Sequence, residues 1–176
     1  MSDAPLLQLH ALVAQRLGRG PEPALDAAAF QAPCTMVFTT FTVDGELRGC
    51  VGCPGPTVGE AARRALEATL EDARFAPLRP EELPRLRLSL SILPPDALEP
   101  VMDPREIALG THGVKVSRDG LGAMFLPQVA QHAGWRTPEE MLDACCRKAG
   151  LPLHAWREGG RVWRFTVRCL AAPGGA

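Results

Sequence analysis

The sequence lacks long apolar runs, blocks of like charge, internal repeats and low-complexity tracts. Because a membrane-spanning helix needs about 20 mostly apolar residues, the short apolar runs predict no membrane segment. The segment Met1–Pro5 has neither the basic start nor the apolar stretch of a signal peptide. We therefore expect a cytoplasmic location, in which the 6 cysteines stay reduced.

The sequence also lacks an excess of either charge, since it has 19 Lys and Arg residues and 20 Asp and Glu residues, for a net charge of −1. Proteins that bind nucleic acids usually carry a basic patch on one face. The two arginine clusters, at residues 63–64 and 85–87, lie among glutamates. This pattern is typical of a solvated, mutually neutralised surface, and we expect no nucleic-acid partner.

The length and composition are those of one globular domain. Of the 176 residues, 46% are hydrophobic and 22% are charged, a balance that argues against disorder. The 17 glycines and 17 prolines exceed ordinary usage. Such an excess favours many turns and short elements over a bundle of long helices.

Apolar periodicity and capping signals predict three main helices. The first covers residues 6–17. Thr57 begins a capping-box sequence, and the helix that it opens should run to about Arg74. A second capping box at Thr137 opens a helix that Gly150 closes.

Alternating and β-branched segments predict the strands. Asp44-Gly45 and Asp119-Gly120 each separate two such segments, as in a hairpin whose type I′ turn needs positive φ at both central residues. The sequence therefore predicts an α+β fold with a mixed, mainly antiparallel sheet and flanking helices. The expected strands cover residues 35–43, 46–52, 86–92, 113–118, 121–126 and 162–167.

The first hairpin predicts which side chains share a strand face with Cys50. Because alternate residues of a strand point the same way, Arg48 should lie on the face of Cys50 and Gly49 on the other. A two-residue turn would place Thr39 opposite Cys50 and Phe41 opposite Arg48. The thiol would then lie beside a guanidinium on a polar face.

Cys50 is the strongest candidate for a reactive group. A guanidinium and the N-terminus of the following helix both favour the thiolate, which is the reactive form of cysteine. Gly49 has no side chain and would let a ligand or another backbone approach closely. The alternative is that Cys50 is a small core hydrophobe, as most free cysteines are.

Cys50 and Cys53 also have the C-x-x-C spacing of thiol–disulfide redox sites. Cys53 directly precedes Pro54, and we expect it in a loop rather than in the first turn of the helix. A structural metal would need further ligands, and the adjacent pair Cys145-Cys146 would diverge along a helix. Both alternatives stay open, but we expect neither a resident metal nor a cofactor.

His112 is the most interesting of the 4 histidines. It precedes a predicted strand, where an imidazole can project into a cleft as a general base or a hydrogen-bond donor. A surface or cap-forming histidine is the alternative.

Several segments resemble, in order along the chain, the motifs of the AMMECR domain family. Leu47-Arg48-Gly49-Cys50-Val51-Gly52 is similar to the L-R-G-C-I-G motif for which this family is known. The resemblance covers about residues 5–170, and residues 1–4 and 171–176 are expected to be flexible ends. Further similar segments are DARFAPL from Asp72, EELP from Glu81, THGV from Thr111, LPQVA from Leu126 and CRKAGLP from Cys146.

The resemblance implies an α+β fold of a larger lobe tightly packed with a smaller one. Prokaryotic members look like the A component of AmmeMemoRadiSam systems, which implies a Memo-like protein and a radical S-adenosylmethionine enzyme as partners. Cys53 departs from the family pattern, and this weakens a redox role for the cysteine pair. The candidate site residues that carry over are Arg48, Gly49, Cys50 and Gly52 from the main motif, and His112, Gln128 and Cys146 from the later ones.

Two functional hypotheses follow. In the first, the chain is an enzyme or an enzyme subunit with a cysteine-centred groove site, acting on a small molecule or a modified residue. Cys50 would be the nucleophile, Arg48 would hold an anionic group, and His112 would move a proton. In the second, the chain is a non-catalytic binding or scaffold module for one of the two implied partner proteins, and Cys50 is structural.

Overall fold

The computed structural model describes residues 4–171, which form an α+β fold of two compact units, each built on its own antiparallel sheet. The first unit comprises residues 4–95 together with 168–171, and the second comprises residues 96–167. Of the expected chain ends, Ala4 begins a helix and Ala171 ends a strand, while residues 1–3 and 172–176 lie outside the described residues. Within residues 4–171, no helix combines the length and apolar character that crossing a membrane requires.

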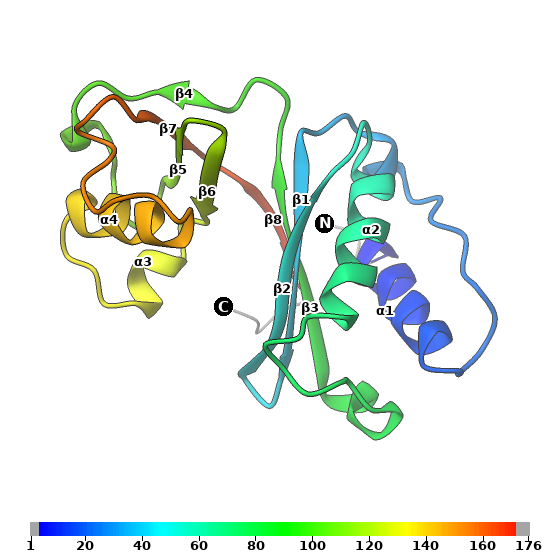
Figure 1. Ribbon diagram of the computed structural model, residues 1–176. Coiled ribbons are helices and arrows are strands. Elements are labelled where there is room, and N and C mark those ends of the chain that lie inside the picture. The colour runs from blue at the N-terminus through cyan, green and yellow to red at the C-terminus, as the bar shows by residue number, and fades with distance from the viewer. Residues whose placement is uncertain (1–3, 172–176) are drawn as a thin grey trace. The chain divides into compact units, whose positions relative to one another are not determined.

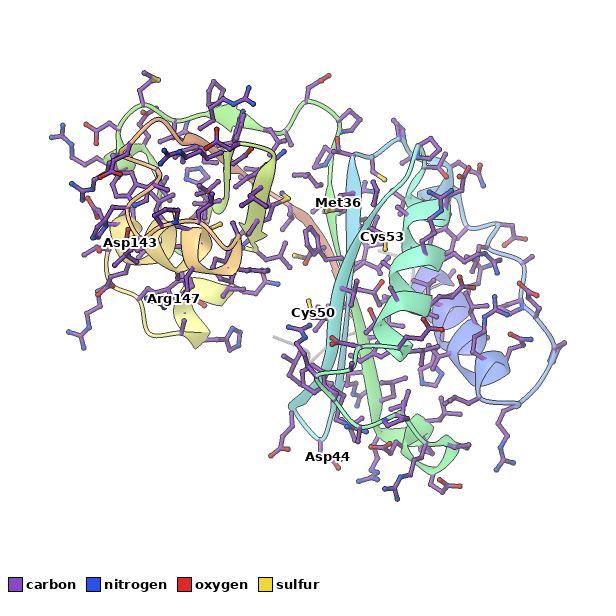
Figure 2. All side chains as sticks on the ribbon, in the orientation of Figure 1. Met36, Asp44, Cys50, Cys53, Asp143 and Arg147 are labelled. Carbon is purple, nitrogen blue, oxygen red and sulfur yellow. The ribbon has the colours of Figure 1, made fainter. Side chains whose placement is uncertain are left out.

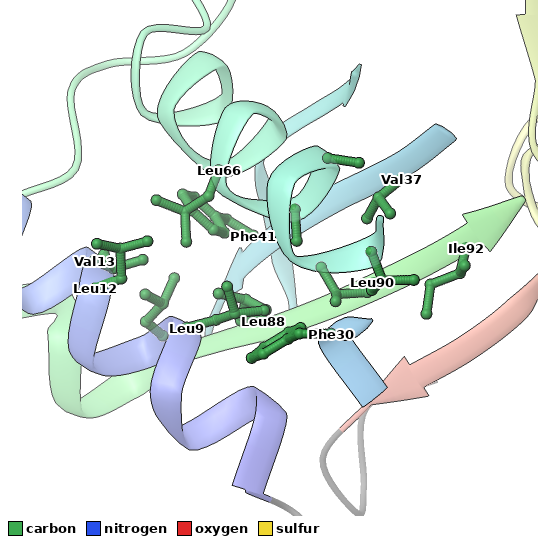
Figure 3. Packing of buried hydrophobic residues seen from close by; sticks show 14 of the residues in the cluster. Leu9, Leu12, Val13, Phe30, Val37, Phe41, Leu66, Leu88, Leu90 and Ile92 are labelled. Carbon is green, nitrogen blue, oxygen red and sulfur yellow. The ribbon is translucent and has the colours of Figure 1, made fainter. Parts of the chain in front are cut away.

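The first unit is a four-stranded sheet in the order β2-β1-β3-β8, with its two long helices on one face (Figure 1). Apolar side chains from both helices and from alternate positions of the central strands meet between these layers (Figure 3). Its elements are α1 (Ala4–Arg16), η1 (Ala28–Gln31), β1 (Met36–Val43), β2 (Glu46–Pro54), α2 (Val58–Leu70), η2 (Pro80–Arg85), β3 (Leu86–Leu93) and β8 (Arg168–Ala171).

The second unit is a four-stranded sheet in the order β4-β7-β5-β6, whose core packs against α4. This core is formed by apolar residues of the strands and by the buried face of the helix. Its elements are β4 (Glu99–Pro100), η3 (Pro104–Glu106), β5 (Gly113–Arg118), β6 (Leu121–Phe125), α3 (Val129–His132), α4 (Pro138–Lys148) and β7 (Arg161–Phe165).

Both predicted Asp-Gly hairpins are confirmed. In the first turn Asp44 has a φ of 53° and Gly45 a φ of 84°. In the second turn Asp119 has a φ of 51° and Gly120 a φ of 82°. Aspartate and glycine tolerate this left-handed conformation, which matches the twist of the flanking strands.

Both predicted helix caps are also in place, because the hydroxyls of Thr57 and Thr137 each accept a hydrogen bond from the backbone three residues on. Two predicted boundaries were wrong. The helix after Thr57 ends at Leu70 and not near Arg74. The last predicted strand ends at Phe165 rather than at residue 167, as β7 of the second sheet, and β8, which pairs with β3 in the first sheet, was not predicted.

Candidate functional site

Arg48 is an extra residue in β2, where the strand bulges. Phe41 pairs with Gly49 and Thr42 with Leu47, so no residue of β1 lies opposite Arg48. A bulge of this kind moves every later pair of the hairpin by one position. As a result Cys50 pairs with Thr40, and the predicted pairings of Thr39 with Cys50 and of Phe41 with Arg48 were wrong.

This shift decides which face of the sheet carries the thiol. Thr39 and Phe41 are 0% and 1% exposed, because they point toward α2 and the core of the first unit. Cys50 lies opposite half-buried Thr40, on the face that α1 and α2 leave uncovered (Figure 2). Because a slip of one residue reverses the faces of a strand, the unbulged register would have placed the thiol against the helix layer.

The thiol of Cys50 is half-buried and contacts a side chain of the neighbouring strand. The hydroxyl of Thr40 donates a hydrogen bond to Cys50 Sγ at 3.4 Å. The arrangement thus provides a partly accessible sulfur whose position the neighbouring strand defines.

Cys53 does not join Cys50 in a redox pair. It lies within β2 and not in a loop as expected, and it pairs with Val37 on the helix-covered face. The two sulfurs project from opposite sides of the strand (Figure 2). Three residues of strand separate Cα atoms by about 10 Å, whereas a disulfide requires about 4.4 to 6.8 Å.

An ion pair binds both backbone polar groups of Cys50. Its N–H donates to Asp72 Oδ2 at 3.2 Å, and its carbonyl accepts from the Arg74 guanidinium at 2.8 Å. Asp72 and Arg74 bond to each other at 2.6 and 2.8 Å. β2 is an edge strand, so this pair occupies hydrogen-bonding positions that a further strand would otherwise fill.

The charge on Asp72 is strongly stabilised. Its side chain is only 6% exposed, and the hydrogen bond from Arg74, with those from the backbone of Cys50 and Arg74, lowers the pKa of its carboxyl to about 2. The same hydrogen bond raises the pKa of Arg74 above its ordinary value. The pair therefore stays ionised across the physiological range.

The early end of α2 is what brings Asp72 to the strand. The N–H groups of Glu71 and Asp72 both bond to the carbonyl of Thr69, which tightens the last turn. Phe75 N–H then bonds to the Asp72 carbonyl and turns the chain back. We did not identify Asp72 and Arg74 as site residues from the sequence, although the family-like segment that begins at Asp72 was the available signal.

Arg48 does not present a free guanidinium. It donates to both carboxylate oxygens of Glu82, at 3.0 and 3.1 Å, and to the Ala76 carbonyl at 3.3 Å. The side chains of Arg48 and Glu82 are 19% and 17% exposed. The backbone N–H of Arg79 and then the Arg48 guanidinium lower the pKa of Glu82. Arg48 thus ties the bulge of β2 to η2.

The two motif glycines are sites of close packing. A Cβ atom on Gly49 would lie 2.6 Å from Thr69 Cγ2 in α2, and one on Gly52 would lie 2.4 Å from the ring of Phe38. Contacts this short do not occur between real side chains, so each position requires glycine unless its neighbour moves. The close approach expected at Gly49 is therefore that of a helix of the same unit.

His112 belongs to the second unit. Its Nδ1 accepts a hydrogen bond from the Ala108 N–H at 3.0 Å, which leaves the proton of the neutral ring on Nε2. Burial, together with the positive charge of Arg164, lowers the pKa of His112, while Glu99 opposes this shift. Its contacts are therefore those of a neutral imidazole held by the turn before β5.

The remaining candidates also lie in the second unit. Gln128 is half-buried just before α3 and makes no side-chain cap hydrogen bond. Cys145 and Cys146 are both 0% exposed within the apolar core. Burial raises the pKa of the Cys145 thiol to about 12 and also raises that of Cys146. Over residues 4–171, no cluster of three or more His, Cys, Asp or Glu side chains could hold a metal ion.

Comparison with known proteins gives consistent matches. The AMMECR1 family model matches residues 10–170. A protein of Thermococcus gammatolerans is 42% identical over 128 residues, which are 69% of this chain and 62% of that protein. A protein of Methanothermobacter thermautotrophicus is 38% identical over 146 residues, covering 78% of this chain and 76% of that protein.

A solved structure is similar over nearly the whole chain. The crystal structure of an uncharacterized protein from Pyrococcus horikoshii matches with a TM-score of 0.83 and 29% sequence identity. The match covers 98% of this chain and 92% of the Pyrococcus horikoshii chain. This chain therefore matches only about three fifths of the length of the Thermococcus gammatolerans protein.

Proposed function

The chain belongs to the AMMECR1 family, and from that premise we propose that it is a cytoplasmic, thiol-dependent enzyme or enzyme subunit that acts through Cys50 on a small molecule or a modified residue. The observation that carries the proposal is the double anchoring of one residue. Asp72 and Arg74 hold the N–H and the carbonyl of Cys50, while its sulfur lies half-buried on the sheet face opposite α1 and α2. A fixed backbone behind a partly accessible thiol is what a positioned nucleophile requires.

The groups of this proposal all belong to the first unit. Cys50 supplies the sulfur, to which the Thr40 hydroxyl donates a hydrogen bond. Arg74, whose side chain is 63% exposed, donates to the Cys50 carbonyl and positions this residue, since Asp72 already binds its guanidinium. Arg48 serves as a positioning residue, because Glu82 already occupies its guanidinium.

In the proposed step a lone pair of Cys50 Sγ forms a bond to an electrophilic carbon of the substrate. The bond from that carbon to its leaving group breaks, and the thiol proton departs with the leaving group. The product is an S-linked adduct on Cys50, which a second nucleophile can release.

The experiment is to trap this adduct. Purified protein is incubated with a small-metabolite extract of the source cells, and its intact mass and cysteine peptides are measured. We expect a mass increase on Cys50 that is lost in Cys50→Ser and retained in the matched variant Cys169→Ser, since Cys169 is more exposed than Cys50. Equal modification of both cysteines, or none on Cys50, would refute the proposal.

A second candidate function is a non-catalytic binding module for a Memo-like protein or a radical S-adenosylmethionine enzyme within an AmmeMemoRadiSam system. The observation that favours it is that the motif residues serve packing. Arg48 binds Glu82, Gly49 lies against Thr69, and Gly52 lies under a phenyl ring. In that case the purified chain should retain one partner in co-purification, and Cys50→Ser should not weaken the complex.

A further inference from the structure

A second potential site lies wholly within the second unit. A cavity of about 660 Å³ opens beside the first residues of β7, next to the segment that follows β4. This volume is within the range of small-molecule sites, about 300 to 1,000 Å³. Leu142 and Val162 contribute apolar walls, and Trp156 and Trp163 contribute aromatic ones.

The charged residues that line the cavity are all basic. Among residues 4–171, Arg157 and Arg161 line it and no aspartate or glutamate does. Each guanidinium lies over an indole ring, Arg157 at 4.3 Å from the Trp156 centroid and Arg161 at 5.6 Å from that of Trp163. Such stacking orients a guanidinium without using its hydrogen-bond donors.

Neither arginine forms an ion pair with a carboxylate of the described residues. Arg48, Arg74 and Arg164 show the contrast, because a carboxylate binds each of them. The cavity therefore contains two oriented cations whose donors are available to an anion.

One aromatic wall is fixed before any ligand enters. Trp156 Nε1 donates to Asp143 Oδ1 in α4 at 2.7 Å, and the same oxygen contacts His154 Nδ1 at 2.8 Å. Figure 2 shows Asp143 on this helix, in the second unit. The indole plane is thereby fixed at its polar edge, so that a planar ligand needs little reorganisation of the wall.

We propose that this cavity binds a small anionic molecule that combines a carboxylate or phosphate group with a planar apolar part. The tryptophans would contact the planar part, while Arg157 and Arg161 would bind the anionic group. An uncharged apolar molecule would leave both guanidiniums unused, and a cation would be repelled by them. The proposal is independent of the reaction at Cys50.

The test uses anilinonaphthalene sulfonate, an anionic aromatic probe whose emission rises on binding. We expect saturable binding to the native chain and a dissociation constant at least tenfold higher for the double variant Arg157→Gln/Arg161→Gln, a loss of about 1.4 kcal/mol. The matched control is Arg147→Gln, an exposed arginine of α4 that does not line the cavity. The uncharged analogue phenylnaphthylamine should bind more weakly and should not distinguish the variants.

A second measurement on the native chain removes any dependence on how the variants fold. Of the 3 tryptophans, Trp156 and Trp163 line the cavity and Trp135 does not. Titration with the probe should shift the indole N–H resonances of the first two and leave that of Trp135 in place. The proposal is overturned if all three shift alike, if none shifts, or if a folded double variant binds the probe as tightly as the native chain.

Discussion

The carboxylate of Asp72 accepts a hydrogen bond from the backbone N–H of Cys50 at 3.2 Å, although 22 residues separate them in the chain. The contact joins the segment after α2 to the exposed edge of β2. Arg74 binds the carbonyl of the same residue and also Asp72. Thus the residue whose sulfur lies on the sheet face opposite α1 and α2 has its backbone fixed by an ion pair with a nearly buried carboxylate.

Replacement of Asp72 by asparagine tests this anchor. The folded-state pKa of about 2 lies below the ordinary value of 3.8, so the charged carboxyl stabilises the fold above about pH 5. That contribution is lost as the pH falls toward 2. With allowance for the solvent exposure of Arg74, we expect Asp72→Asn to lower the free energy of unfolding by about 1 to 2 kcal/mol at pH 7.

Urea unfolding at several pH values measures this difference. The gap between the native chain and Asp72→Asn should narrow steadily between about pH 5 and 2. The neighbouring exposed variant Glu71→Gln serves as the control and should change stability by less than about 0.5 kcal/mol. A gap that stays constant with pH would mean that the carboxylate charge is not what stabilises the strand edge.

Alanine at Gly49 should be poorly tolerated. The added Cβ would lie 2.6 Å from Thr69 Cγ2 and 3.1 Å from the Thr69 carbonyl oxygen, so α2 would have to move. We expect a loss of about 1 to 3 kcal/mol in the free energy of unfolding. The double variant Gly49→Ala/Thr69→Ser should recover part of the loss, because serine lacks the methyl group but keeps the hydroxyl that donates to Ala65. Purely additive effects would show that the two residues are not in contact.

The pair of Arg48 and Glu82 should behave as one structural unit. Arg48→Ala leaves a mostly buried carboxylate without its cation and should cost about 1 to 3 kcal/mol of unfolding free energy. In a double-mutant cycle, Glu82→Ala added to Arg48→Ala should cost clearly less than it does alone. Arg87→Ala, at an exposed position of β3, is the control. If the two changes lower the free energy of unfolding independently, the ion pair between Arg48 and Glu82 is not what stabilises the bulge.

The cysteines should differ widely in alkylation of the native protein. Cys145 and Cys146 should react only after unfolding, because burial shields them and raises the pKa of both thiols, that of Cys145 to about 12. If Cys50 is a nucleophile, it should react at least as fast as the more exposed Cys169. Iodoacetamide labelling followed by peptide mass spectrometry gives each rate. A Cys50 that stays unmodified until the fold melts would favour the binding-module function.

The sequence was sufficient where a feature depends on a few neighbouring residues. Asp44-Gly45 and Asp119-Gly120 predicted two hairpins, because their residues accept the positive φ that such turns need. The threonine caps began α2 and α4 at the predicted places for the same local reason. The motif around Cys50 and the segment after α2 could be recognised by resemblance, without any knowledge of how they meet.

Tertiary structure decided which face of the sheet carries the thiol. A two-residue turn alone would have paired Cys50 with Thr39, but the bulge at Arg48 pairs it with Thr40. That bulge lies where Glu82 of η2 binds the Arg48 guanidinium, a contact between segments 34 residues apart. The local sequence determines the turn. The strand register beyond the bulge also depends on such long-range contacts. A shift of the register by one residue reverses the sheet face of every later side chain.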